Sequence, residues 1–492
     1  MLKTINNNIN LRLFFIFFCA LNFVFAYYQI TFFWGNHDWD WVKGTTQVLQ
    51  WNTGMFEGRY AKFFLNSLLF GGQVLPILNT ETAFLLLSLG STLLIKYWQI
   101  KDEITGILAG LIAILTPCIL GWLYFPINII GNFLAVTAVC SGLLLNENPK
   151  IWHKVAGASC FLIALGVYPS VMEMMIICFC FRYIIKPDNK PIIKPAVWLI
   201  ASLLLFKILL LILGKLGFIY DGHYNMQIVT VMELIKRTPE MIKLIFLQLI
   251  TGVPFVSLKI KLIGLSLIVI SVFAARKHYI SIILLGLALG ATVLSTWLTK
   301  SPDETAYMPR VNFYSLSFLY AGCTALLLNQ KGLIRNAGMA LSLLLIWQNV
   351  LNDFEASKVW QLGRTAEINL TERITGRIEE REKKHLLIPV VAGEMPLRPK
   401  YYHTSYQKES PYVLNGALLV RHIPSGMFNF YAIEPPFYGY SGISEISPEL
   451  YQYLSKDGKS WPNKNALFVD DVYAVILLTP KGVKNIRDQL PY

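Results

Sequence analysis

Long apolar runs recur throughout this sequence and constrain its fold more than any other feature. Of its 492 residues, 54% are hydrophobic and only 15% are charged, and the mean hydropathy is +0.49. A soluble domain carries about 25% charged residues, and an apolar stretch of about 20 residues can cross a bilayer as a helix. The runs therefore predict an α-helical polytopic membrane protein.

About 11 transmembrane helices are expected from these runs. The first run follows a basic start without a clean small-residue cleavage site, so we interpret it as a retained helix and not as a signal peptide. The segments are residues 12–30, 77–98, 104–123, 126–145, 154–168, 170–186, 196–214, 255–275, 279–298, 311–329 and 333–350.

The distribution of basic residues predicts how these helices are oriented. The formal net charge is +13, and Lys and Arg gather in alternate short connections. Cytoplasmic connections of membrane proteins are enriched in Lys and Arg, which predicts a cytoplasmic position for residues 146–154, 181–195, 275–279 and 329–336. On the opposite side of the membrane we then expect residues 31–62, 215–254, 299–310 and everything after about residue 350. We do not expect nucleic acid as a partner, because no basic segment interleaved with aromatic residues is present.

Two further apolar segments are ambiguous. Residues 241–257 are apolar enough to span, which would invert the orientation of all later helices and place Arg276 and Arg335 outside. An amphipathic helix in the outer interface is our preferred interpretation. Residues 60–76 are too short to span and are predicted to form a juxtamembrane helix.

The composition changes after Asn352. Residues 353–385 show helical spacing with many charged pairs, and residues 385–393 and 466–478 are predicted strands. We therefore expect two parts: a transmembrane region over 1–352 with an outward loop at 31–62, and a small outward α/β domain over 353–492.

The outward loop at 31–62 carries the strongest candidates for chemistry. Asp38 and Asp40 follow the first helix in the sequence GNHDWDW. In an extended backbone residues i and i+2 point to the same side, so both carboxylates can face one cavity and one can act as a general base. The alternative is an ordinary solvated loop.

Several cations and polar residues on the same predicted side are further candidates. Arg59, Arg310 and Lys300 are suited to binding a phosphate, although interfacial anchoring explains them equally well. Glu57 and Glu173 are candidate substrate contacts; Glu173 lies near membrane depth, where ionisable groups are costly and often functional, unless a neighbouring helix satisfies it. His223 is a weaker candidate, because a lone loop histidine is usually a surface residue. Histidine and cysteine spacing predicts no metal site, and the seven cysteines are interpreted as small buried hydrophobes.

The order of these features resembles the serotype-converting O-antigen glucosyltransferases of bacteria, a branch of the polytopic GT-C glycosyltransferases. The outward α/β domain at the end of the chain fits the same pattern. The motifs that carry the resemblance are HDWD at 37–40, Gly58-Arg59 before the next apolar run, the corner Gly166-Val167-Tyr168-Pro169-Ser170, and Pro309-Arg310. The family's aspartates are adjacent, whereas Trp39 separates them here, so the choice between Asp38 and Asp40 stays open. Pro169 stands where the family has glutamine.

The resemblance implies a GT-C-like, multi-pass enzyme of the bacterial inner membrane. Its catalytic loop and C-terminal domain would face the periplasm. It would move a hexose, glucose in this family, from a polyprenyl-phosphate donor to lipopolysaccharide O-antigen or a related surface glycan. A flippase would deliver the lipid-linked sugar, and a polyprenyl-phosphate sugar synthase would make it. Tyr168 in the corner motif becomes a candidate substrate contact.

The implied chemistry agrees with the residue types in the loop. The departing phosphate needs cations, which Arg59, Arg310 and Lys300 could supply, and Asp38 or Asp40 could accept the proton of the attacking hydroxyl. Backside attack would invert the anomeric carbon. No cofactor is required; a divalent ion between aspartate and phosphate is compatible with this arrangement.

Two alternatives from other functional classes stay open. A transporter or flippase for lipid-linked oligosaccharide would show internal repeats and charges near the membrane midplane, whereas no repeat is visible and the ionisable residues cluster outside. The other alternative is a non-catalytic protein of envelope polysaccharide assembly.

Overall fold

The computed structural model describes most of the chain. The described residues are 10–30, 55, 58–70, 76–123, 129–186, 192–219, 230–246, 249, 256–276, 278–298, 314–381, 388–392, 447–470, 473–478, 480 and 483–484. The described residues divide into two compact units, one containing those up to Phe354 and the other those from Glu355 onward. Each unit is described by itself.

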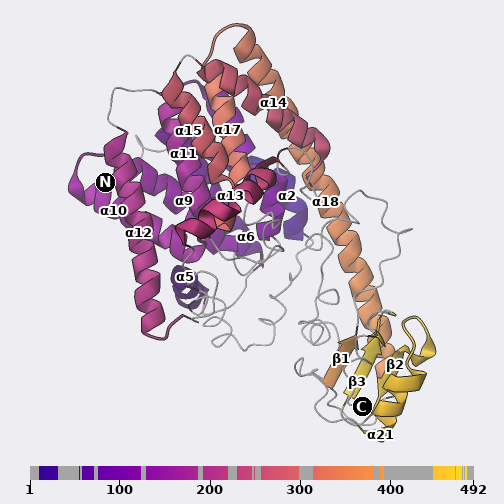
Figure 1. Cartoon of the computed structure of the whole chain (residues 1–492). Helices are drawn as coiled ribbons and strands as arrows, with labels where there is room; N and C mark the ends of the chain where they lie inside the picture. Colours follow the sequence, from indigo (N-terminus) through magenta and orange to yellow (C-terminus); the bar gives the residue numbers. More distant parts are fainter. Residues whose placement is uncertain are drawn as a thin grey trace. The chain divides into compact units, whose positions relative to one another are not determined.

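The first unit is a bundle of apolar helices (Figure 1). Four described helices are long and apolar enough to cross a membrane: α6 (Pro76–Tyr97), α9 (Ile129–Asn146), α12 (Ile193–Lys215) and α14 (Leu258–Ala275). Further apolar helices are α2 (Leu11–Ile30), α7 (Glu103–Ile114), α10 (Ile151–Val167), α11 (Val171–Ile185), α15 (Tyr279–Ala291) and α17 (Tyr314–Leu328). A helix thus lies in every segment that the apolar runs predicted.

Two of these segments are broken and not continuous as expected. Residues 104–123 form α7, the short helix η2 (Pro117–Ile119) and α8 (Leu120–Leu123). Pro117 explains the break, because proline lacks the N–H that a helix interior requires. Residues 279–298 form α15 and α16 (Leu294–Leu298), and the backbone N–H of Ser295 in α16 donates to the Glu173 carboxylate at 3.0 Å.

The last helix of the first unit is much longer than the predicted span. Residues 333–350 are the first part of α18 (Leu333–Glu379), a single helix of 47 residues that also contains the charged segment predicted to be helical after residue 352. No proline interrupts it, so the composition changes while the helix continues.

An amphipathic helix, α13 (Val231–Phe246), begins ten residues before the ambiguous apolar segment 241–257. Figure 1 shows it running obliquely across the direction of α12. One face of α13 carries exposed apolar side chains, those of Val231, Ile235, Ile242 and Phe246. Another face carries the charged residues at 233, 236, 240 and 243. An exposed apolar face opposite a charged one is typical of a helix lying in a membrane interface. The juxtamembrane helix predicted within 60–76 is α5 (Tyr60–Phe70).

Ion pairs join helix ends at one end of the bundle. The Arg12 guanidinium lies 3.0 Å from Glu103 at the start of α7, and Arg335 near the start of α18 lies 3.4 Å from Asp102. The ends of α9 and α11 are joined similarly through Glu147 and Arg182 at 3.5 Å. These pairs bring the starts of α2, α7 and α18 to the same end.

The second unit contains a three-stranded sheet in the order β1-β3-β2 (Figure 1). Strand β1 (Ile388–Ala392) pairs in parallel with β3 (Tyr473–Leu477), with Val390 opposite Val475, and β2 (Leu467–Val469) pairs antiparallel with β3. The single strand predicted for 466–478 is therefore wrong. Asp470, which follows β2, is of a residue type that strands disfavour.

Helical turns and α18 cover this sheet. Helix α21 (Pro448–Gln452) is followed by one π turn (Tyr453–Asp457) and a 3-10 turn (Lys464–Ala466). The Arg377 guanidinium lies 4.3 Å from the ring centre of Trp461, and Arg381 donates to the Leu467 carbonyl at 2.7 Å. These contacts join the end of α18 to the sheet.

Candidate active site

The structure describes three of the nine candidate site residues. Arg59, Tyr168 and Glu173 lie in described segments. The other six fall outside the described residues: Asp38, Asp40, Glu57, His223, Lys300 and Arg310. The structure therefore gives the positions of Arg59, of Tyr168 at the helix corner and of Glu173 inside its helix.

A tight turn places Arg59 at the start of α5. The Gly58 N–H donates to the Met55 carbonyl at 2.9 Å, and Gly58 has a φ of +75°, a conformation that glycine adopts without steric cost. Space is also restricted, because a Cβ at Gly58 would lie 3.1 Å from the Leu210 side chain. The positive φ at this position explains why a glycine precedes Arg59.

Tyr60 attaches this turn to the helix corner at 166–170. Its hydroxyl donates to the Leu162 carbonyl at 2.8 Å. Its ring lies against Gly166, where an added Cβ would come within 2.5 Å of two ring carbons. The first glycine of the corner motif is therefore the surface that receives the Tyr60 ring.

Arg59 lies over the ring of Tyr168, the central residue of the corner. The guanidinium carbon is 5.3 Å from the ring centre, within the range of a cation–π interaction. Tyr168 contacts Trp122 edge to face at 6.0 Å, and Trp122 lies 4.2 Å from Tyr314 at the start of α17. A guanidinium suits a phosphate group, whereas Trp122 and Tyr314 are buried and support the corner from inside the bundle.

Glu173 is held inside the bundle. The residue has no exposed surface, and its Oε1 accepts hydrogen bonds from the Ser295 N–H at 3.0 Å and from the Ser295 hydroxyl. The Ser315 hydroxyl is a further donor to this carboxylate. Neighbouring helices thus satisfy part of its hydrogen-bonding capacity, and Oε2 has no partner among the described residues.

Sequence reasoning missed Trp122, which contacts Tyr168, and Tyr314, which contacts Trp122. Both lie in apolar segments, where an aromatic side chain is usually interpreted as core. Pro117, where the regular helix breaks between α7 and η2, was the available signal in the sequence. No cluster of His, Cys, Asp and Glu within the described segments could hold a metal ion, and all seven cysteines are free.

Comparisons with known proteins give one match. Neither the curated proteins nor the solved structures contain a match to this chain. The model of the family described as glucosyl transferase GtrII matches residues 44–319, which is more than half of the 492 residues. That stretch includes Arg59, Tyr168 and Glu173. The chain belongs to the glucosyl transferase GtrII family, and it is accordingly a multi-pass membrane glucosyltransferase.

Proposed function

We propose that this enzyme moves a hexose, glucose, from a polyprenyl-phosphate donor to lipopolysaccharide O-antigen or a related surface glycan. The observation that carries the proposal is the position of Arg59 over Tyr168 at the corner of α10 and α11. A guanidinium at this point suits the phosphate of a lipid-linked sugar, because its planar fork matches two phosphate oxygens. Family membership supports the glucosyl transfer.

The proposed topology has about 11 spans in the bacterial inner membrane. The ends joined by Arg12–Glu103 and Arg335–Asp102 face the cytoplasm, in agreement with the basic connections beside them. Arg59 and Tyr168 then face the periplasm, where a flipped donor is available. The region 1–352 carries the GT-C-like catalytic site, and 353–492 is a periplasmic α/β domain.

The proposed reaction is a single displacement. The acceptor hydroxyl oxygen attacks the anomeric carbon while the bond from that carbon to the phosphate oxygen breaks, and polyprenyl phosphate leaves. Asp38 or Asp40 accepts the hydroxyl proton, and the anomeric configuration inverts. Arg59, Arg310 and Lys300 stabilise the departing phosphate.

Glu57, Tyr168, Glu173 and His223 stay predicted substrate contacts. Of the two that the structure describes, Tyr168 has the more suitable position, because it lies directly beneath Arg59. Glu173 already accepts hydrogen bonds from Ser295. A flippase and a polyprenyl-phosphate sugar synthase are the proposed functional partners, and a divalent ion remains compatible with the aspartates.

Separate Asp38→Asn and Asp40→Asn variants of the full-length enzyme test this proposal. Loss of the general base should lower the rate of glucosyl transfer from a polyprenyl-phosphate glucose by about 10²–10⁴-fold, while loss of the other aspartate should have a smaller effect. Asp102→Asn, at the opposite end of the bundle, is the matched control and should keep full activity. If both loop variants insert normally and transfer at the wild-type rate, the assignment of the base is wrong.

A further inference from the structure

Glu173 follows Tyr168 closely in the chain, and backbone hydrogen bonds connect the two residues. The Val171 N–H donates to the Tyr168 carbonyl at 3.1 Å, and the Glu173 N–H donates to the Ser170 carbonyl at 3.1 Å. Each bond reaches back three residues, as in a tight helical turn. The position of the Glu173 side chain is therefore coupled to the backbone of the corner that carries Tyr168.

The Glu173 carboxylate joins α11 to the starts of two other helices. Its Oε1 accepts hydrogen bonds from the N–H and the hydroxyl of Ser295, the second residue of α16. The hydroxyl of Ser315, the second residue of α17, is a further donor to it. In the sequence, Lys300 and Arg310 lie between these two serines. One buried carboxylate thus holds both the helix that precedes these predicted phosphate ligands and the helix that follows them.

The connection through α17 returns to the corner by aromatic contacts. Tyr314 is the first residue of α17, and its ring centre lies 4.2 Å from that of Trp122. Trp122 contacts Tyr168 edge to face at 6.0 Å, and Tyr168 lies beneath the Arg59 guanidinium. Glu173 therefore closes a ring of contacts. It is connected on one side to the backbone of the corner, and on the other side to the helix whose first side chain supports the corner through Trp122.

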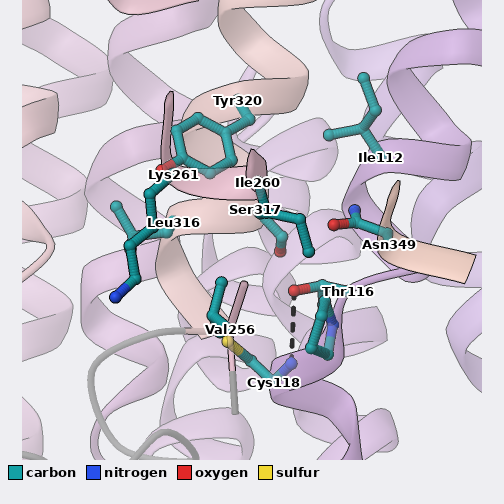
Figure 2. Close-up of a pocket in the computed structure, with 11 residues that line it drawn as sticks. Ile112, Thr116, Cys118, Val256, Ile260, Lys261, Leu316, Ser317, Tyr320 and Asn349 are labelled. Carbon is teal, nitrogen blue, oxygen red and sulfur yellow. Dashed lines mark hydrogen bonds between the residues drawn. The ribbon is translucent and has the colours of Figure 1, made fainter. Parts of the chain in front are cut away.

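A small cavity leaves the packing around the first turn of α17 incomplete. Leu316 and Ser317 line this cavity together with Thr116 and Asn349 on neighbouring elements (Figure 2). Its volume of about 20 Å³ holds about one water molecule and no larger ligand. Side chains beside a void have fewer neighbours to hold them, so the hydrogen bond from α17 to Glu173 contributes more to the position of this turn.

The connection through α16 extends to the amphipathic helix α13. The indole N–H of Trp297 in α16 donates to the Leu234 carbonyl at 3.0 Å, and Arg237 donates to the Trp297 carbonyl at 3.3 Å. Helix α13 is thus bonded to α16 in both directions, and α16 is bonded to Glu173. The same carboxylate therefore holds the helices on both sides of the predicted phosphate ligands.

We propose that Glu173 is a positioning residue for glucosyl transfer, which keeps Tyr168 and the Arg59 guanidinium in place without touching the substrate. The inference rests on the proposed function, in which Arg59 binds the donor phosphate. Glu173 has no exposed surface, and its Oε1 is already bonded to Ser295. This role differs from the substrate contact predicted from the sequence, and replacement of the charge alone separates the two.

Full-length Glu173→Gln and Glu173→Leu enzymes in lipid nanodiscs test the proposal, with transfer of glucose from polyprenyl-phosphate glucose to host lipopolysaccharide as the readout. Gln keeps an acceptor oxygen for Ser295 in nearly the same volume, so kcat/KM should stay within about threefold of wild type. Leu removes the acceptors and lets the corner shift, which should lower kcat/KM by about 10–100-fold. Thr324→Val removes a buried hydroxyl that lies 3.0 Å from that of Ser342, further along α17. It is the matched control and should keep the wild-type kcat/KM.

A double-mutant cycle separates positioning from a general loss of stability. In an Arg59→Ala background, Glu173→Leu should lower kcat/KM by less than about threefold, because both changes remove the same positioned cation. Additive losses in folded enzyme would overturn the proposal. A folded Glu173→Leu enzyme with wild-type kinetics would also overturn it, and so would a Gln variant as impaired as the Leu variant, which would assign a substrate contact to the charge.

Hydrogen exchange tests the positioning without any transfer activity. Exchange at the amides of residues 170–172 should rise about tenfold in Glu173→Leu and stay unchanged in Thr324→Val. Ser315→Ala removes a single donor and should show a smaller rise of about threefold, so it serves if Glu173→Leu does not fold. Unchanged exchange in both variants refutes the positioning role. Wild-type enzyme that transfers no glucose refutes the proposed function separately, whatever the exchange at the corner.

Discussion

Replacing Gly166 with alanine tests how the chain positions Arg59. A Cβ at this position would lie 2.5 Å from Cε2 and Cζ of the Tyr60 ring and 2.9 Å from its hydroxyl. These separations are well below van der Waals contact, so the ring must move. Because Tyr60 directly follows Arg59 and its hydroxyl bonds to Leu162 in α10, that movement displaces the guanidinium from Tyr168.

The magnitude follows from the contacts that are lost. Overpacking of a filled site costs about 1–3 kcal/mol of unfolding free energy, and loss of the Tyr60 hydrogen bond adds about 0.5–1.5 kcal/mol. If Arg59 binds the donor phosphate, loss of a charge-assisted hydrogen bond worth about 1.5–3 kcal/mol lowers kcat/KM by about 10–150-fold. Activity should therefore fall in enzyme that is still folded.

The assay compares donor-dependent glucosyl transfer and thermal unfolding of Gly166→Ala with those of Gly286→Ala. Gly286 is the matched control, because an added Cβ there meets no atom within 4 Å. In a double-mutant cycle, Gly166→Ala should cost almost nothing more once Tyr60→Ala has removed the ring. A Gly166→Ala enzyme with the kinetics and stability of the Gly286→Ala control would refute the reasoning.

Two smaller predictions concern the opposite end of the bundle and the second unit. Asp102 caps α7 by accepting a hydrogen bond from the Thr105 N–H at 3.1 Å. Asp102→Ala should lower the unfolding free energy by about 0.5–2 kcal/mol in chemical denaturation. Asp102→Asn keeps a capping side chain and should lower the unfolding free energy by less. The pKa of Asp102 is lowered by hydrogen bonds from the Thr105 hydroxyl and the Thr105 N–H, and less by Arg335. The carboxylate therefore stabilises the fold above about pH 4, and this contribution should disappear on further acidification. If wild type and Asp102→Asn showed the same pH dependence of stability, this reasoning would be wrong. Trp461→Ala should release Arg377 from its ring and destabilise the second unit by about 3–5 kcal/mol, measured as increased hydrogen exchange in β3, whereas Tyr451→Ala at an exposed position is the control.

The positions of the helices in the first unit were predictable from the sequence, because the apolar runs are long and their backbone must form its own hydrogen bonds in a bilayer. A chain segment in a bilayer must satisfy its own backbone hydrogen bonds, and a helix does this locally. The predicted boundary between 154–168 and 170–186 agrees with the observed end of α10 at Val167 and start of α11 at Val171. Local composition was sufficient wherever the decisive partner was the segment itself.

The breaks inside two predicted spans depended on less local information. Pro117 is visible in the sequence, and its effect on 104–123 was missed because the apolar run continues past it. Beyond the end of α15, the Ser295 N–H donates to Glu173, which lies more than 100 residues away in the sequence. No pattern within 279–298 contains that information.

The candidate site, too, was only partly predictable from the sequence. The Gly-Arg dipeptide and the corner motif were visible as motifs, but the contact between them requires Tyr60 to lie on Gly166. Trp122 and Tyr314 join this site only through tertiary packing. Asp38 and Asp40 remain predictions from residue type and position in the chain.

The ion pairs at one end of the first unit's bundle join helix ends, as in Arg12–Glu103 and Arg335–Asp102. Buried acceptors without a hydrogen-bond partner among the described residues occur at that end, at Asn146 Oδ1 and Glu147 Oε1, and also deeper in the bundle, at Glu173 Oε2. A missing partner therefore does not by itself distinguish a ligand site from the rest of the bundle. The contact of Arg59 with Tyr168 is different, because it holds a cation where α5 meets the corner of α10 and α11. The proposed binding of the donor phosphate depends on this contact, and Gly166→Ala tests it directly.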